Sequence, residues 1–154
     1  MTAETRDPLT VETVLAPIDG SEESTAAVEY AIAIAERYDA SIHVLYVLGY
    51  GVIEGLDAGT VSSDAVADHT SDVLAGVERL AADRDIPMTS SIAHGFSTAV
   101  KTRHPGSVVL DAADEIGVDF VVLPRVSTTD ASADVLERTA EYVLAYASEP
   151  VLSV

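Results

Sequence analysis

The sequence predicts a single α/β domain with a five-stranded parallel sheet and helices on both faces. Its 154 residues suit one domain, and a hydrophobic content of 48% is sufficient for a full core. Short apolar runs alternate along the chain with longer segments of helical periodicity. Such alternation implies parallel strands that are joined by right-handed crossovers through helices.

Five segments are predicted to be strands. Four are short and largely apolar, and the remaining one, Met88–Ala93, can form the third strand after Pro87 stops the preceding helix. The five segments are Thr13–Ile18, Ser41–Leu48, Met88–Ala93, Val118–Leu123 and Pro150–Val154. The stretch Met1–Thr10 has no apolar block, and we expect it to be a flexible tail that carries no signal peptide. The domain is therefore expected to occupy residues 11–154.

Four segments are predicted to be helices from the spacing of their apolar residues. They are Glu22–Tyr38, Asp64–Asp85, Val108–Ile116 and Ala131–Ala147. Ser21 is a suitable N-cap for the first helix, and Gly117 suits the end of the third. The inward faces are expected to hold Ala27, Tyr30, Ala31, Ile34, Ala35 and Tyr38 in the first helix, and Val135, Thr139, Tyr142, Val143 and Tyr146 in the last.

Three connections are expected to be irregular. They are a mobile loop over Gly49–Ser63 with four glycines, an irregular link over His94–Gly106, and a turn over Pro124–Asp130. Ligands of open parallel sheets bind beyond the carboxyl ends of the strands, at the point where the strand order reverses. This rule directs attention to Pro17–Ser21, Val47–Gly51 and Pro124–Asp130.

The charge balance is strongly acidic. There are 26 acidic and 8 basic residues, the net charge is -18, and Lys101 is the only lysine. Such a surface repels nucleic acid and anionic membranes, so we expect neither as a partner. Acids dispersed along the chain with almost no lysine favour adaptation to a high-salt cytoplasm, where screening over ~3 Å at 1 M makes self-repulsion tolerable. An ordinary acidic protein is the alternative.

The sequence offers no recognisable catalytic or metal-binding motif. It has no cysteine, and its histidines at 43, 69, 94 and 104 lack the paired spacing of zinc ligands. No nucleophile motif supports a Ser-His-Asp arrangement. His43, inside an apolar strand, is expected to be a satisfied core or interface residue. No apolar stretch reaches the roughly 20 residues of a membrane span. We therefore expect a cytoplasmic protein that is not an enzyme and holds no metal.

Four segments together resemble the universal stress protein family. They are the opening strand and turn Val14–Glu22 (VLAPIDGSE), His43–Val47 (HVLYV), Val118–Leu123 (VDFVVL), and the closing helix and strand Ala140–Val154. The resemblance covers roughly Val11–Val154 and is weakest between Gly49 and Gly106. It implies a Rossmann-like or flavodoxin-like sheet, and a homodimer joined through the last strand, Pro150–Val154. Pairing that edge strand would remove an aggregation hazard.

Many members of this family bind ATP through a glycine pattern after the fourth strand, in which backbone N–H groups approach the phosphates. The positions that correspond to this pattern are Pro124, Ser127, Glu137 and Arg138, so none of its glycines is present. Proline offers no N–H group, and Glu137 would repel a polyphosphate. Arg125 and Arg138 could pair with phosphate, or with acidic side chains on the surface.

The adenosine end of the family's site is better preserved. Pro17 and Asp19 match positions that line the base and ribose, and Val47 matches a third. Asp19 has an alternative role in shaping the Asp19-Gly20-Ser21 turn. The candidate site residues are therefore Pro17, Asp19, Val47, Ser127 and Arg138, with the adenosine end favoured over the phosphate end.

The favoured hypothesis is a non-catalytic stress-response or regulatory protein that binds a partner protein or a small adenine-type ligand, without ATP as an ordinary cofactor. An ATP- or AMP-binding sensor with a remodelled phosphate site is the second hypothesis. The third is an enzyme of the wider nucleotide-binding α/β group.

Overall fold

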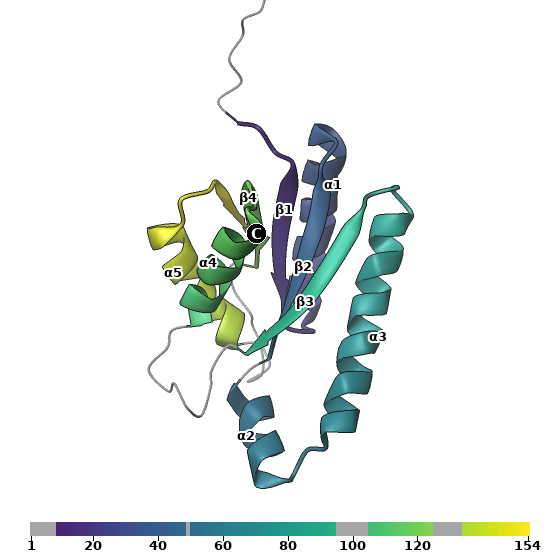
Figure 1. Ribbon diagram of the computed structural model, residues 1–154, viewed down its shortest axis with the longest axis vertical. Helices are drawn as coiled ribbons and strands as arrows, with labels where there is room; N and C mark the ends of the chain where they lie inside the picture. Colours follow the sequence, from purple (N-terminus) through teal and green to yellow (C-terminus); the bar gives the residue numbers. More distant parts are fainter. Residues whose placement is uncertain (1–8, 49, 95–104, 125–133) are drawn as a thin grey trace, which may run out of the picture.

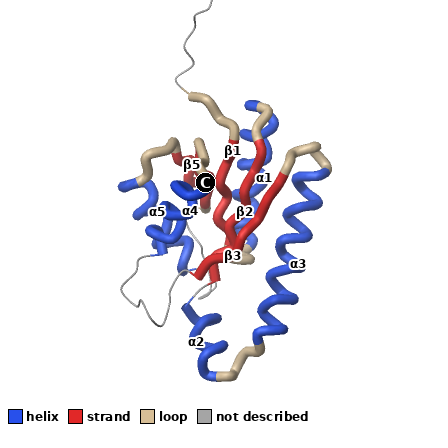
Figure 2. The backbone as a smooth tube through the Cα atoms, in the orientation of Figure 1, coloured by secondary structure: helices blue, strands red, loops and turns tan. Residues whose placement is uncertain are grey.

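The sheet has five parallel strands in the order β3-β2-β1-β4-β5 (Figures 1 and 2). The strands are β1 (Thr13–Ile18), β2 (Ser41–Leu48), β3 (Met88–His94), β4 (Phe120–Leu123) and β5 (Val151–Ser153). The structure is a computed structural model that describes residues 9–48, 50–94, 105–124 and 134–154. The predicted fold class and all five predicted strands are confirmed, with boundaries that differ by up to two residues.

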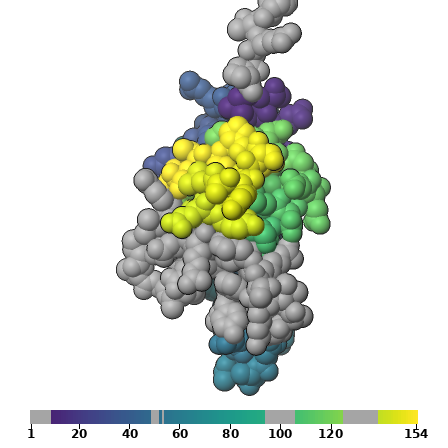
Figure 3. Space-filling model, turned by 90° about the vertical axis from the view of Figure 1, so that its left-hand side faces the viewer, coloured from purple at the N-terminus to yellow at the C-terminus, as the bar shows by residue number. Residues whose placement is uncertain are grey.

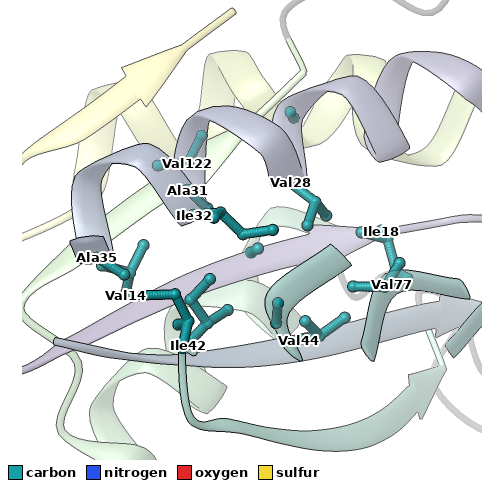
Figure 4. Packing of buried hydrophobic residues seen from close by; sticks show 14 of the residues in the cluster. Val14, Ile18, Val28, Ala31, Ile32, Ala35, Ile42, Val44, Val77 and Val122 are labelled. Atoms are coloured by element: carbon teal, nitrogen blue, oxygen red, sulfur yellow. The ribbon is translucent and has the colours of Figure 1, made fainter. Parts of the chain in front are cut away.

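Helices cover both faces of the sheet. They are α1 (Glu22–Tyr38), α2 (Tyr50–Ala58), α3 (Ser63–Ala82), α4 (Pro105–Ile116) and α5 (Asp134–Tyr146). Side chains of α1 and α3 form one buried cluster with Val14, Ala16 and Ile18 of β1. Figure 4 shows Val14 and Ile18 beside the side chains of α1. Side chains of α4 and α5 join a second cluster around Leu15, on the opposite face. The alternation of buried residues along β1 therefore places one core on each side.

The helix α1 begins where the sequence predicts, because Ser21 caps it. The Ser21 hydroxyl oxygen accepts a hydrogen bond from the Ser24 N–H at 3.1 Å, and Asp39 ends the helix in the left-handed conformation at φ 55°. Gly117, with φ +79°, closes α4 as expected.

Two predicted inward faces are partly wrong. In α1, Val28 and Ile32 are buried beside Ala27, Ala31 and Ala35, whereas Tyr30 and Tyr38 are 53% and 39% exposed. In α5, Thr139 and Val143 are buried as predicted, but Tyr146 is 68% exposed. The physical reason is shared: a tyrosine ring can lie at the margin of a helix face with its hydroxyl in water, whereas aliphatic side chains occupy the sheet contact. Val135 has a side chain outside the described part.

The expected loop over Gly49–Ser63 is also wrong, because residues 50–58 form α2. Gly55 and Gly59 allow the chain to pack closely against itself at the end of this helix. The Gly55 carbonyl accepts hydrogen bonds from the N–H groups of Thr60 and Val61 at 2.9 and 3.1 Å. A Cβ atom at Gly55 would lie 2.6 Å from Val61 Cγ2. Gly59 then turns the chain with φ +76°. The expected connection His94–Gly106 falls mostly outside the described residues, although α4 begins within it at Pro105.

His43 is a satisfied core residue, as predicted. It is 8% exposed, and its ring nitrogens Nδ1 and Nε2 lie 2.7 and 2.8 Å from the hydroxyl oxygens of Thr89 and Ser91 on β3. Burial lowers the pKa of His43 below its usual value of 6.5. A neutral imidazole with both nitrogens engaged links β2 to the edge strand and has no free nitrogen for a ligand.

Candidate functional site

The strand order reverses between β1 and β4. These strands are neighbours in the sheet, yet β1 leads into α1 on one face, and the helix that follows β4 in the sequence, α5, packs on the other (Figure 1). Crossovers that leave in opposite directions keep helices from covering the carboxyl edge at that point. The register pairs Ile18 with Tyr46, so Asp19 and Val47 follow at the same edge.

Asp19 holds the turn that connects β1 to α1. Its Oδ1 atom accepts a hydrogen bond from the Ser21 N–H at 3.0 Å. The Asp19 N–H donates to Ser24 Oγ at 3.3 Å, and that hydroxyl donates to the Ser21 carbonyl at 2.9 Å. The turn role considered for Asp19 is therefore present in the structure.

The second carboxylate oxygen of Asp19 is not used by the turn. Asp19 Oδ2 is buried and has no hydrogen-bond partner in the described part of the chain. A buried carboxylate oxygen without a partner is costly, and such atoms are rare in folded proteins. This oxygen can accept hydrogen bonds from ligand hydroxyl or amino groups at the carboxyl edge of the sheet.

Tyr46 contacts the Asp19 turn through its hydroxyl group. Its hydroxyl donates to the Asp19 carbonyl at 3.5 Å, and a Cβ atom at Gly20 would lie 2.9 Å from the same hydroxyl oxygen. Gly20 also has φ +87°, so this position requires glycine for two reasons. Burial raises the pKa of Tyr46, the negative charge of Asp19 adds to the rise, and a hydrogen bond from Thr70 opposes it. The phenol thus stays protonated and remains a donor.

Of the other predicted site residues, some are buried at the ends of strands and some lie outside the described part of the chain. Pro17 is buried at the end of β1. Val47 is 1% exposed and packs in the core with Leu15 and Leu45, so its side chain offers no polar contact to a ligand. Pro124 is buried directly after β4. Ser127 and Arg125 lie outside the described residues, and Arg138 and Glu137 lie on α5 with side chains that are also outside them.

Sequence reasoning missed Tyr46, which contacts the Asp19 turn, and Thr70, which hydrogen-bonds to Tyr46. Tyr46 is the only residue with a polar side-chain atom among the alternate positions Ile42, Val44, Tyr46 and Leu48, all four of which face the α1 and α3 side. This single hydroxyl group in an aliphatic row was the one sign in the sequence that Tyr46 makes a polar contact. Among the residues that the structure describes, no group of three or more histidine or acidic side chains could hold a metal ion. None of the described helices is long and apolar enough to cross a membrane.

The sheet order and the reversal between β1 and β4 define a Rossmann-like α/β protein. The universal stress protein family matches residues 10–154. The chain therefore belongs to that family. It is 25% identical over 144 residues to a universal stress protein of Methanocaldococcus jannaschii, covering 92% of this chain and 80% of the relative.

Solved structures of universal stress proteins share the fold. The universal stress protein UspA of Lactobacillus plantarum superimposes with a TM-score of 0.73 at 22% identity, covering 96% of this chain and 99% of the other. A universal stress protein in complex with cAMP gives 0.67 at 19% identity, covering 94% and 97%. One from Archaeoglobus fulgidus in complex with dAMP gives 0.62 at 16% identity, covering 93% and 96%.

Proposed function

We propose that this protein acts in the cytoplasm as a non-catalytic stress-response regulator that binds an adenine nucleoside or mononucleotide at the Asp19 turn. The observation that carries the proposal is the buried Asp19 Oδ2 atom, which lacks a partner among the described residues at the carboxyl edge of the sheet. A carboxylate there can accept hydrogen bonds from the hydroxyls of a ribose or the amino group of adenine.

Two family members with this fold were solved with cAMP and dAMP, which each carry one phosphate. A mononucleotide makes smaller demands on the phosphate end than ATP does. Position 124 after β4 is proline, which has no N–H to offer. We therefore propose that the nucleoside part supplies most of the binding energy. The alternative is an ATP- or AMP-binding sensor in which Arg125 and Arg138 replace the glycine cradle.

Calorimetric titration in molar KCl with adenosine, AMP, ADP and ATP, each with magnesium, tests the proposal. We expect adenosine and AMP to bind and ATP to bind no more tightly than AMP. Asp19→Asn should weaken binding by about tenfold or more, because a hydrogen bond to a charged acceptor contributes about 1.5–3 kcal/mol. The asparagine keeps an oxygen for the Ser21 N–H and places an amide nitrogen, which cannot accept, at the free position.

Glu22→Gln is the matched control, because it removes the same charge from the neighbouring exposed first turn of α1. It should bind AMP as the original protein does. Unchanged affinity in Asp19→Asn would remove the support for the site. Micromolar ATP binding that is much tighter than AMP binding would instead favour the remodelled-sensor alternative.

We also propose that the protein forms a homodimer through β5. This strand lies at one edge of the sheet, and Val151–Val154 are all half-buried. Figure 3 shows the C-terminal residues, in yellow, spread over the surface of the molecule. The Val154 N–H donates to Leu123 of β4 and the Pro150 carbonyl accepts from Val121. By strand alternation, the N–H groups of Val151 and Ser153 point to the open edge, where a second copy can pair with them.

Ser153→Pro should therefore convert the dimer to a monomer, as measured by sedimentation velocity. Proline removes the outward N–H and is tolerated on edge strands, so pairing with β4 is retained. Ser153→Ala keeps that N–H and should remain dimeric. A dimeric Ser153→Pro protein, or a monomeric original protein, would show that β5 is not the interface.

A further inference from the structure

A hollow of about 230 Å³ lies between β2, α2 and α3, on the face of the sheet that α1 and α3 cover. It is bordered by residues of β2, α2, the turn after α2, and the first half of α3. Asp19 and Pro124, the residue that follows β4, do not line it. Tyr46 belongs to both places, since its ring borders the hollow and its hydroxyl reaches the Asp19 carbonyl. His69, on the rim of the hollow, also lies beside the turn, with its Nε2 atom 3.5 Å from where a Cβ atom of Gly20 would be.

The walls of this hollow are mainly aliphatic. Leu48, Val52, Val61 and Val66 contribute side chains from four successive segments of the chain. None of the described residues that line it is acidic, although the chain carries 26 acids. An apolar recess without acids, in so acidic a protein, is suited to an uncharged occupant.

The hydroxyl groups at one end of the hollow are already paired. The Tyr46 hydroxyl donates to the Asp19 carbonyl and accepts from Thr70. Within the described residues, the buried side-chain polar atoms without partners are Asp19 Oδ2 and Ser153 Oγ, and neither residue lines the hollow. A bound water needs two to four polar partners. The hollow offers few such groups, so water is a poor occupant of its apolar part.

Size selects the class of ligand. An apolar cavity of roughly 150 Å³ holds one benzene molecule. About 230 Å³ has room for a substituted benzene or an indole ring. The rim is accessible, because Val61, Ala65 and His69 are exposed. The exposed imidazole of His69 can hydrogen-bond to one polar group of a ring that enters.

We propose that this hollow is a binding site for a small neutral aromatic molecule, phenol-sized to indole-sized, with one hydrogen-bonding group beside His69. The site does not rest on the nucleotide proposal, because the Asp19 carboxylate that carries that proposal does not line the hollow.

Titration with indole and phenol, followed by methyl NMR of the full-length protein in molar KCl, tests the proposal. We expect saturable shifts confined to the methyl groups that line the hollow, which are those of Leu48, Val52, Val61, Ala65, Val66 and Thr70. Ala65→Phe should abolish these shifts, because its ring would fill the rim of the hollow. Ala65 is exposed on α3, so the substitution should leave the fold intact.

Ala67→Phe is the matched control, since Ala67 is exposed on the same helix and does not line the hollow. It should bind indole as the original protein does. Loss of the shifts in Ala65→Phe alone supports the site. Non-saturable shifts, shifts elsewhere, or equal binding by both phenylalanine variants would overturn it. Binding of AMP is measured in parallel, so failure of one site is distinguished from failure of the other.

Discussion

Raising the KCl concentration from about 0.1 M to about 2 M should raise the melting temperature by roughly 10 °C or more. The reason is the net charge of -18 on 154 residues. At low salt the screening length is about 10 Å, so neighbouring carboxylates repel one another across the surface, and at molar salt it falls to about 3 Å. Thermal unfolding followed by circular dichroism measures the effect. A melting temperature that is independent of KCl would contradict salt adaptation.

One part of this repulsion can be located. Asp64, Asp68 and Asp72 are exposed at intervals of four residues along α3, so each carboxylate faces the next. Asp68→Lys replaces two repulsions with two attractions, and it should stabilise the protein by about 0.5–1 kcal/mol at low salt. The gain should fade in molar KCl. Ala67→Lys is the control, because it adds the same cation one position away without removing a carboxylate. A smaller gain in stability there would show that the effect of Asp68→Lys comes from the repulsion among the three aspartates.

Gly106→Ala should destabilise the protein by about 1–3 kcal/mol, near the upper end of that range. Gly106 lies in the first turn of α4, where a Cβ atom would approach Tyr142 Cδ1 to 2.5 Å and Tyr142 Cβ to 2.6 Å. Rotating the tyrosine ring does not relieve the second contact, because Cβ is fixed to the backbone of α5. The two helices would have to separate. Urea unfolding measures the loss.

Gly76→Ala is the matched control for this prediction. Gly76 is also helical, in α3, but the nearest atom to an added Cβ is the end of the Arg79 side chain at 3.8 Å. Alanine should therefore stabilise α3 by about 0.5–1 kcal/mol through its higher helix propensity. Equal destabilisation by both substitutions would show that glycine matters for helix flexibility rather than for the α4–α5 contact.

Four of the strands were predictable because each is a short, largely apolar run, and Ser21 and Gly117 marked helix ends through local chemistry. The edge strand β3, with the sequence MTSSIAH, is not apolar and was predictable only from its place after the helix that Pro87 was expected to end. The helix α2 was not predictable from its glycines. Their usual meaning is a loop, and only the packing of Gly55 against Val61 shows otherwise. The exposure of Tyr30 and Tyr146 likewise depends on which flank of each helix meets the sheet. The spacing of apolar residues predicts which side of a helix is buried, but it does not tell whether a tyrosine at the margin of that side is buried or exposed.

The candidate site divides in the same way. Asp19 could be found from its place at the end of an apolar strand, and its double potential, as turn residue and ligand acceptor, was visible in the sequence. The contact of Tyr46 with that turn depends on the register that pairs Ile18 with Tyr46. Such a register follows from the folded sheet and not from spacing along the chain. The positions of Ser127 and Arg138 at the phosphate end stay a prediction.

The central position of β1 has a consequence for how the chain is made. β1 pairs with β2 over six residues from Thr13↔Ser41 to Ile18↔Tyr46, whereas its other neighbour, β4, begins at Phe120. During synthesis, a three-stranded sheet with α1 and α3 on one side can assemble long before the second half emerges. Until α4 and α5 arrive, Leu15, Leu45 and Val47 have no cover on their own side. The nascent chain therefore exposes an apolar sheet face for a time. Aggregation or binding by a chaperone is expected at this stage of synthesis.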